Sequence, residues 1–203
     1  MFHWQSKITY PFIYLDSSYV LRSRKFNAEI ITRKFFKKHP ERCKKILKEM
    51  QLASQEDNEY YKQIEGLQQK GRLSTFITME TLNSSVQVER PNQIALFGTL
   101  NDSKLIYTSN KHEWDLGSVV LWEESVDFKT FNKAAIAIAN AECIIADAAF
   151  FRVSAGKSLA EYIMTGCHFL IASIDVKEIE IGGNYILCEL PPNDLIKYLS
   201  SDF

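Results

Sequence analysis

The sequence has no apolar run of 18 residues, so it predicts no transmembrane helix. The residues from Met1 to Gln5 lack the basic and then apolar pattern of a secretory signal peptide. The four cysteines form no Cys-x-x-Cys pair, and three of them lie inside apolar runs. That distribution favours reduced thiols in a protein core over disulfides or a zinc site. We therefore expect a cytoplasmic protein that does not associate with a membrane.

Two common enzyme motifs are also incomplete. Residues 155–158 read Ala-Gly-Lys-Ser and end like a phosphate-binding P-loop, but Phe151 stands where that motif requires its first glycine. The four histidines are scattered, with no serine or cysteine at a recognisable spacing, which argues against a hydrolytic triad. The chemistry has to be sought in the acidic and basic residues.

The composition is that of an ordinary globular protein. The chain has 203 residues, of which 46% are hydrophobic and 24% are charged. A chain of this length buries roughly 70% of its unfolded surface, which is enough for a core without a metal or disulfide. We expect a single domain over residues 1–203.

Short apolar runs without alternation recur along the chain between helical patterns. The clearest helix, residues 127–141, carries small and apolar residues on most of its faces. Strands that are apolar on both faces are typical of a parallel sheet covered by helices on both sides. The sequence thus predicts an α/β fold with three layers, α/β/α, around a mainly parallel central sheet. The expected strands are residues 11–15, 143–146, 169–172 and 185–188.

Further helices are expected in both halves of the chain. Residues 55–70 are polar and favour a helix, for which Gly71 is a C-cap. Residues 73–82 begin as a strand and are expected to pass into a helix. Residues 158–164 and 193–200 complete the predicted helices.

A strongly basic segment spans residues 22–48. It carries eleven Lys and Arg against two Glu, a net charge of +9 in a chain whose net charge is −1. Such a patch can attract a phosphate backbone, so we expect RNA as a partner; the alternative is a solvated helix face. The residues expected to contact RNA are Arg22, Arg24, Lys34, Lys37, Lys38, Arg42, Lys44 and Lys45.

Acidic residues stand where a parallel sheet places its ligands. Asp16 ends the first strand, Asp147 ends the strand 143–146, and Glu80 follows a strand in the middle of the chain. Carboxylates that converge from distant positions repel one another unless a cation joins them, and such oxygen ligands suit Mg²⁺ or Mn²⁺. An ion of this kind activates water against a phosphodiester. The alternative for each acid alone is a helix cap or a surface position.

This pattern resembles the PIN-domain ribonucleases. Residues 12–21, FIYLDSSYVL, are similar to the family's opening strand and aspartate. Residues 75–82, TFITMETL, resemble the region of its helical glutamate, and residues 133–150 resemble its small-residue helix, strand and final aspartate. The resemblance implies a PIN-like domain over residues 1–203, with a helical, basic insertion at about 22–72, that acts as a metal-dependent endoribonuclease.

The same resemblance implies a set of site residues. The catalytic residues would be Asp16, Glu80, Asp127 and Asp147, of which Asp16, Glu80 and Asp147 would hold Mg²⁺ or Mn²⁺. The family's third acid falls near Thr130 in this chain. Either Asp127, about one turn earlier, replaces that acid, or the site is degenerate and does not cut RNA. Enzymatic activity is therefore left open by the sequence.

A second resemblance covers residues 158–173, which are similar to the nucleotide-sugar-binding segment of glycosyltransferases with two Rossmann domains. In that family the residue matching Glu161 holds the nucleotide ribose, whereas Val153 stands where an earlier glutamate is usual. The resemblance implies a non-catalytic or nucleotide-sugar-binding Rossmann-like module. A third hypothesis is a degenerate PIN-like interaction domain that binds a protein partner. The sequence indicates no oligomeric state.

Overall fold

The structure is a computed structural model, and it describes the central sheet and most of the helices that cover it. The residues with described side chains fall in 4–17, 38–39, 41, 59–78, 92–96, 128–151, 155–173 and 185–201. Short strands at 82–83, 99–101, 104–106 and 113–114 are described as backbone alone.

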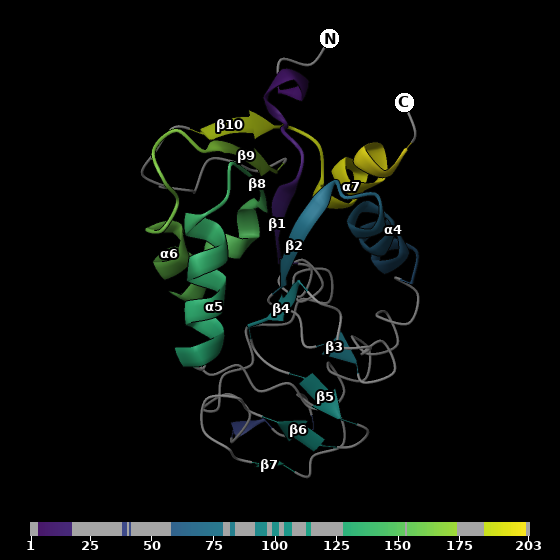
Figure 1. The fold of residues 1–203 in the computed structure, drawn as a ribbon. Helices are drawn as coiled ribbons and strands as arrows, with labels where there is room; N and C mark the ends of the chain where they lie inside the picture. The colour runs from purple at the N-terminus through teal and green to yellow at the C-terminus, as the bar shows by residue number, and fades with distance from the viewer. Residues whose placement is uncertain are drawn as a thin grey trace.

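Six parallel strands form the central sheet, in the order β10-β9-β8-β1-β2-β4 (Figure 1). Every pair of neighbouring strands in it is parallel, which confirms the predicted sheet. The strands are β1 (Phe12–Asp16), β2 (Leu73–Thr78), β4 (Gln93–Ala95), β8 (Cys143–Asp147), β9 (His168–Ala172) and β10 (Tyr185–Cys188).

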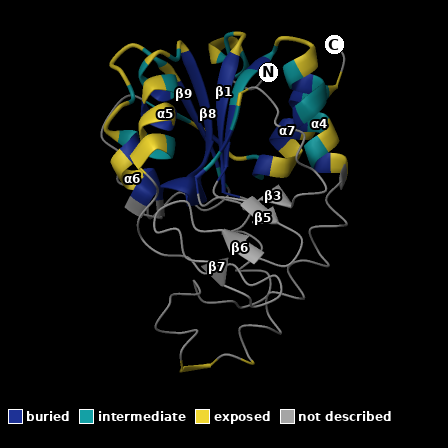
Figure 2. Cartoon of the chain, turned by 60° about the horizontal axis from the view of Figure 1, so that its bottom comes forward, coloured by how far each residue is buried: buried dark blue, intermediate teal, exposed yellow. Residues whose placement is uncertain are grey.

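The two central strands are buried along their whole length because helices cover both faces of the sheet. All five residues of β1 and all five of β8 are buried, and the strands appear dark blue in Figure 2. Ile13 pairs with Ile144, and Leu15 pairs with Ala146. Continuous apolar sequence without alternation is what such strands need, and it made them recognisable in the sequence.

Helices lie on both faces of the sheet, so the fold has the three layers that the sequence predicted (Figure 1). The helices α5 and α6 cover one face, and α4 and α7 cover the other. Two short 3-10 helices, η1 and η3, flank β1 and β8. The bounds are η1 Gln5–Lys7, α4 Asn58–Gln69, α5 Phe128–Ala139, η3 Ala148–Arg152, α6 Ser154–Ala160 and α7 Pro192–Ser200.

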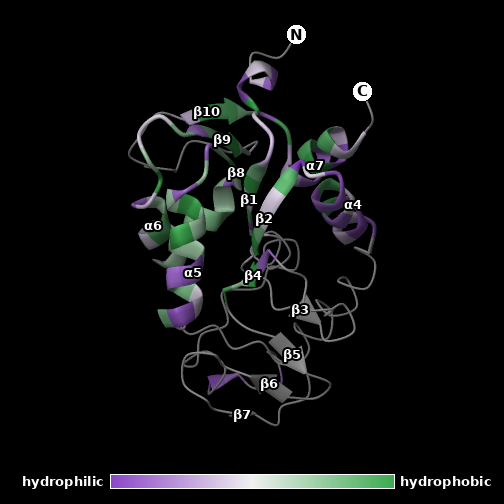
Figure 3. Cartoon of the chain, viewed as in Figure 1, coloured by the Kyte–Doolittle hydropathy of each residue, from purple (hydrophilic) through white to green (hydrophobic). Residues whose placement is uncertain are grey.

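An aromatic core lies between the sheet and the α4–α7 layer. Tyr14 of β1 stacks on Phe76 of β2, with ring centroids 6.1 Å apart. Trp4 meets Tyr198 of α7 edge to face at 5.6 Å, which joins the N-terminal segment to the last helix. Figure 3 shows the strands as largely hydrophobic and α4 as largely hydrophilic, as expected for a helix with one buried stripe.

A second sheet, described only as backbone, has the order β3-β5-β6-β7. Its first pair is parallel and the other two pairs are antiparallel. The strands are β3 (Leu82–Asn83), β5 (Thr99–Asn101), β6 (Lys104–Ile106) and β7 (Glu113–Trp114).

Two expected elements differ from the structure. Residues 78–82 were expected to be helical, whereas Thr78 ends β2 and Leu82 begins β3. The helix expected at 158–164 begins four residues earlier, at Ser154, and ends at Ala160. The prediction of a single domain over residues 1–203 stays a prediction. Among the described residues, no helix has both the length and the apolar character needed to cross a membrane.

Candidate functional site

The strand order of the central sheet reverses at β1. From β1 the chain adds β2 and β4 on one side, and β8, β9 and β10 on the other. Counted along the chain, the six strands follow the order 3-2-1-4-5-6 of doubly wound nucleotide-binding sheets. In such sheets ligands bind outside the carboxyl ends of the strands, at the point of reversal. The ends of β1 and β8 are therefore the place where a ligand site is expected.

Two carboxylates lie at this point. Asp16 is the last residue of β1 and Asp147 the last residue of β8, and the register of the two strands sets them side by side. Strand alternation places both side chains on the face of the sheet that carries α4 and α7. The two residues are almost fully buried, with exposed fractions of 1% and 2%.

Neutral donors of the chain bind both carboxylates. The Tyr60 hydroxyl of α4 donates to Asp16 Oδ1 at 2.7 Å, and the Thr78 hydroxyl of β2 donates to Asp16 Oδ2 at 2.6 Å. The Ser17 hydroxyl donates to Asp147 Oδ2, and the backbone N–H of Ala149 donates to Asp147 Oδ1 at 3.0 Å. Three strands, the helix α4 and the 3-10 helix η3 after β8 thus meet in one polar cluster.

Tyr14 adds a further hydroxyl beside this cluster. It lies two residues before Asp16 on the same face of β1 and is fully buried. Its hydroxyl lies beside the Tyr60 hydroxyl and within electrostatic reach of both carboxylates.

Burial changes the proton affinity of the acidic and phenolic groups. It raises the pKa of Asp147 to about 7, against the opposing hydrogen bonds from Ser17 and Ala149, and the charge of Asp16 raises it further. Burial also raises the pKa of Tyr60 and of Tyr14 well above the usual value, and in both cases Asp16 adds to the effect. Tyr60 therefore stays protonated and donates to Asp16. We name the set Asp16, Ser17, Tyr60, Thr78 and Asp147 the carboxylate–hydroxyl cluster.

The structure brings together two of the four acids that were predicted to form a site. Asp16 and Asp147 are adjacent, whereas Glu80 and Asp127 lie outside the described residues. Of the basic residues expected to contact RNA, only Lys38 is described, and it is exposed. RNA binding by this segment stays a prediction. Glu161 is exposed and follows the last residue of α6, away from the strand ends.

Sequence reasoning missed the hydroxyl residues of the cluster. Tyr60 lies in a polar helical stretch, and no periodicity shows that its hydroxyl reaches across to β1. Thr78 was assigned to a helix, although it directly ends a run of strand residues. A polar residue at the last position of a buried strand is the signal that would have found Thr78, because Asp16 and Asp147 occupy the same position in their strands.

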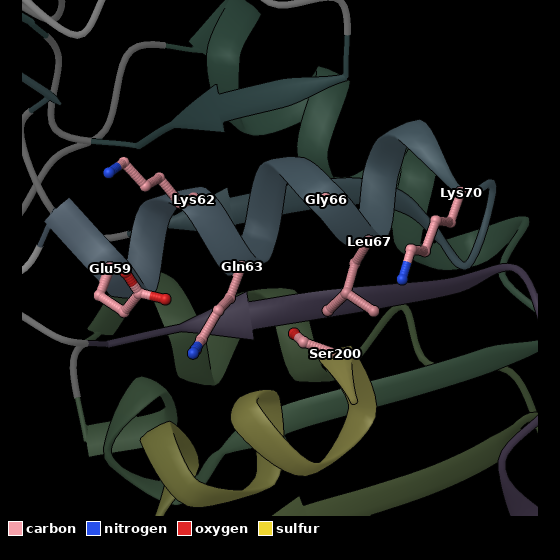
Figure 4. Close-up of a pocket in the computed structure, with 7 residues that line it drawn as sticks. All are labelled: Glu59, Lys62, Gln63, Gly66, Leu67, Lys70 and Ser200. Carbon is pink, nitrogen blue, oxygen red and sulfur yellow. The ribbon is translucent and has the colours of Figure 1, made fainter. Parts of the chain in front are cut away.

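Two pockets lined by described residues lie elsewhere in the molecule. One, of about 190 Å³, is a groove between α4 and α7 that is lined in part by Gly66, and in it the Leu67 side chain points toward Ser200 (Figure 4). The other, of about 400 Å³, lies near the amino ends of β1 and β2, beside Pro11 and Ser74. Neither is lined by a residue of the carboxylate–hydroxyl cluster.

No known protein-family model matches this sequence, and no curated protein matches it either. Solved structures of Sir2 proteins share its fold. Sir2Tm bound to a propionylated peptide aligns over 93% of this chain and 91% of its own, with a TM-score of 0.66 and 12% identity. A Sir2 homologue in complex with NAD aligns over 97% and 91%, with a TM-score of 0.63 and 15% identity. A Sir2 homologue variant in complex with ADP-ribose aligns over 98% and 95%, with a TM-score of 0.66 and 16% identity.

At identities of 12–16% the likeness shows the fold alone. It nevertheless does not support the PIN-domain interpretation, because these structures, which align over nearly the whole chain, are of Sir2 proteins. The prediction of a ribonuclease that depends on Mg²⁺ or Mn²⁺ is therefore wrong, whereas the assignment of Asp16, Glu80, Asp127 and Asp147 as site residues stays a prediction. Acids at strand ends recur throughout α/β folds, so the matching segments reflected shared architecture.

The chemistry of the described acids agrees with this correction. Among the residues that the structure describes, no three His, Cys, Asp or Glu side chains gather as a metal site. The carboxylate oxygens of Asp16 and Asp147 accept hydrogen bonds from the chain itself. The predictions of a nuclease, of a hydrolase and of magnesium-dependent RNA binding are therefore also wrong. The prediction of an α/β fold is confirmed.

Proposed function

We propose that this chain is a nucleoside- or nucleotide-binding module with a Sir2-type fold, and that its ligand lies at the carboxyl ends of β1 and β8. The strand order carries this proposal, because the reversal point of a doubly wound sheet is where nucleotides bind. The solved structures with this fold support it, since Sir2 homologues among them were determined with NAD or ADP-ribose.

The described residues suit one part of such a ligand better than the other. Dinucleotide sites of doubly wound sheets use a carboxylate to bind ribose hydroxyls and a glycine-rich turn after the first strand to approach the pyrophosphate. This chain places two carboxylates at the strand ends. The first glycine in its sequence, however, is Gly66, so the sequence has no glycine-rich stretch directly after Asp16 and Ser17.

The described strand ends therefore offer groups suited to the ribose part of NAD, whereas the sequence lacks the glycine-rich motif that binds the pyrophosphate in such sheets. We assign no NAD-dependent reaction step to this chain for that reason. The earlier hypothesis of a Rossmann-like nucleotide-binding module is retained in this broader form. We do not retain the hypothesis that Glu161 binds the ribose of a nucleotide sugar, because Glu161 is exposed beyond the end of α6.

Thermal unfolding of the full chain in the presence of adenosine, ADP-ribose or NAD tests the proposal. A ligand at 100 times its Kd stabilises the native state by about 2.7 kcal/mol, which raises the Tm by roughly 5–10 °C for a chain of this size. We expect at least one of the three to do so, and Asp147→Asn to reduce the shift. Ser74→Ala is the matched control, since Ser74 donates to the Phe12 carbonyl at the other end of the strands. No shift with any of the three ligands would refute nucleotide binding.

A further inference from the structure

The pocket of about 400 Å³ at the amino ends of β1 and β2 lies on the face of the sheet that carries α5. Ile13 and Thr75, which pair across the two strands, form its floor, and the end of α5 forms its wall. Pockets that bind small molecules range from about 300 to 1,000 Å³, so this one has room for a ligand. All the residues that line it belong to the described part of the chain.

The pocket exists because α5 ends in small side chains above the sheet. Ala137 and Ala141 are four residues apart, about one helical turn, and both line it. Among the described elements, α5 packs mainly against β4 and α6. The methyl groups of the two alanines leave the space over Ile13 and Thr75 open. The apolar part of the lining is therefore aliphatic, and no aromatic side chain belongs to it.

This pocket is separate from the proposed nucleotide site. Ile13 precedes Asp16 by three residues, which is about 10 Å along a strand. Strand alternation also places the two side chains on opposite faces of the sheet. A molecule in the pocket would not contact the carboxylate–hydroxyl cluster, so binding here does not depend on nucleotide binding.

The polar atoms around the pocket are mainly hydrogen-bond acceptors. The Ser74 hydroxyl already donates to a backbone carbonyl of β1 at 3.1 Å, so its oxygen can still accept. The Asn140 amide nitrogen donates to the carbonyl one turn earlier at 3.0 Å, which leaves the amide oxygen as an acceptor. Thr75 adds a hydroxyl oxygen and Glu142 adds a carboxylate. A ligand group that brings several donors and no acceptor suits this set.

The electrostatics of the pocket favour a positive charge. Glu142 is exposed and carries the only charge among the residues that line the pocket. The carbonyl end of α5 lies at the same place, and such a helix end is equivalent to about half a negative charge. The last turn of α5 contains no basic residue that could balance it. The last basic residue of the helix, Lys133, precedes Ala137 by one turn and does not line the pocket.

We propose that this pocket binds the ammonium group of an aliphatic primary amine. An ammonium group has three N–H donors and no acceptor, which matches the oxygen atoms of Glu142, Asn140 and Thr75. The aliphatic chain of the ligand packs over Ile13 and Ala137. A quaternary ammonium suits the pocket less, because it has no N–H donor and the lining has no aromatic ring to hold it.

Titration of the full chain with small ligands of one size tests this without any substitution. The amide NMR signals of Thr75 and Glu142 report on the pocket, and n-butylamine, which is protonated at neutral pH, should shift them to saturation. The neutral n-butanol should bind about twofold to fivefold more weakly, the range for one exposed ion pair, and butyrate should not bind. Equal affinity for the amine and the alcohol, or no saturable shift with the amine, would overturn the proposal.

Two substitutions test the two halves of the site. Glu142→Gln should weaken n-butylamine binding by about twofold to fivefold, and Glu161→Gln, an equal change of charge beyond the end of α6, should leave it unchanged. Ala137→Leu should abolish binding by filling the pocket, whereas Ala139→Leu, on the same helix but outside the lining, should not. Unchanged affinity in both Glu142→Gln and Ala137→Leu would overturn the site.

Two further measurements keep the outcome clear. Circular dichroism shows whether each variant folds, and if Ala137→Leu does not fold, the ligand series on the wild-type chain together with Glu142→Gln decides. ADP-ribose should not displace n-butylamine, because the pocket and the carboxyl ends of β1 and β8 lie apart. Displacement would overturn the placement of the amine, whereas a failure of ADP-ribose to bind at all would refute only its own binding and leave the amine site standing.

Discussion

Burial holds the Asp147 carboxyl away from water, and its pKa rises to about 7 as a result. An acid whose pKa is higher in the folded than in the unfolded chain binds more protons when folded. The stability it contributes is complete below the ordinary value of 3.8 and is lost as the pH rises through about 7. Asp16 is the titratable group beside it, and Tyr60 and Tyr14 stay protonated over this range.

We therefore expect the free energy of unfolding to fall between about pH 5 and about pH 8, with roughly 2–3 kcal/mol of the loss due to Asp147. Urea unfolding at a series of pH values measures this directly. Asp147→Asn removes the ionisation and should flatten the slope. A slope that is identical in wild type and variant would place the responsible group elsewhere.

The Tyr60 hydroxyl is a second residue whose role can be measured. It donates to Asp16 Oδ1 at 2.7 Å inside the core, so its removal leaves a buried acceptor without that donor. Tyr60→Phe should lower the free energy of unfolding by about 1.5–3 kcal/mol, the range for hydrogen bonds to charged groups. Tyr162→Phe is the control, because Tyr162 is 43% exposed and should change stability by less than about 0.5 kcal/mol. Equal effects of the two changes would show that the bond to Asp16 contributes nothing.

For single residues, the sequence predicted Asp16 and Asp147 as site residues but not the side chains that bind them. Asp16 and Asp147 each follow an apolar run, and parallel strands collect such ends at one edge of the sheet. The hydroxyl groups that donate to Asp16 belong to residues far away in the sequence, and no local sequence pattern links them to it. Tyr60 precedes β2 by a whole helix, and Thr78 was assigned to the wrong kind of element. The missing information was the face of the sheet on which each side chain lies.

Helix α4 contains one glycine inside it and another just beyond its end, and the two have different physical roles. A Cβ at Gly66 would meet no atom within 4 Å, because this position opens onto the groove beside α7 (Figure 4). Gly71 has a φ of +68° and ends the helix, with its N–H bonded to the Gln68 carbonyl. The sequence correctly placed Gly71 as the C-cap.

Gly66→Ala should raise the free energy of unfolding by about 0.5–1 kcal/mol, because alanine is the better helix former and fits without contact. Gly71→Ala should lower it by about 1 kcal/mol or more, because the left-handed conformation is unfavourable for a side chain. Chemical denaturation of both variants measures the difference in sign. If Gly66→Ala destabilises the chain as Gly71→Ala does, position 66 is not open in solution.

Element types were predictable where the hydrophobic pattern was strong. The strands β8, β9 and β10 and the helix α5 match their predictions to within about two residues, because buried apolar runs and small-residue helices are distinctive. The helix α6 was misplaced because its first turn contains Ser154 and Gly156, which are weak helix formers. Its tertiary contacts with α5 and η3 override that preference.

The order of the strands is a property of the whole molecule that the sequence pattern did not reveal. The hydrophobic pattern identifies each strand, but it does not tell on which side of β1 the following strands lie. The order depends on which face each connecting helix covers, and α4 and α5 pack on opposite faces (Figure 1). That choice creates the reversal at β1, and with it the edge at which Asp16 and Asp147 meet.

The last helix is part of the central core, and this leads to a test of cooperativity across the molecule. Leu195 of α7 is fully buried in the same cluster as Phe76 of β2 and Leu170 of β9, and Arg72 donates to the Leu199 carbonyl at 3.0 Å.

Leu195→Ala should lower the free energy of unfolding by about 2–5 kcal/mol, the range for buried leucines. Because Leu195 contacts a core shared by β2 and β9, amide hydrogen exchange should accelerate by the same factor in both strands. Lys197→Ala, on the exposed side of α7, is the matched control and should change neither stability nor exchange. Faster exchange confined to α7, with β2 and β9 protected as in the wild type, would show that the helix docks as a separate unit.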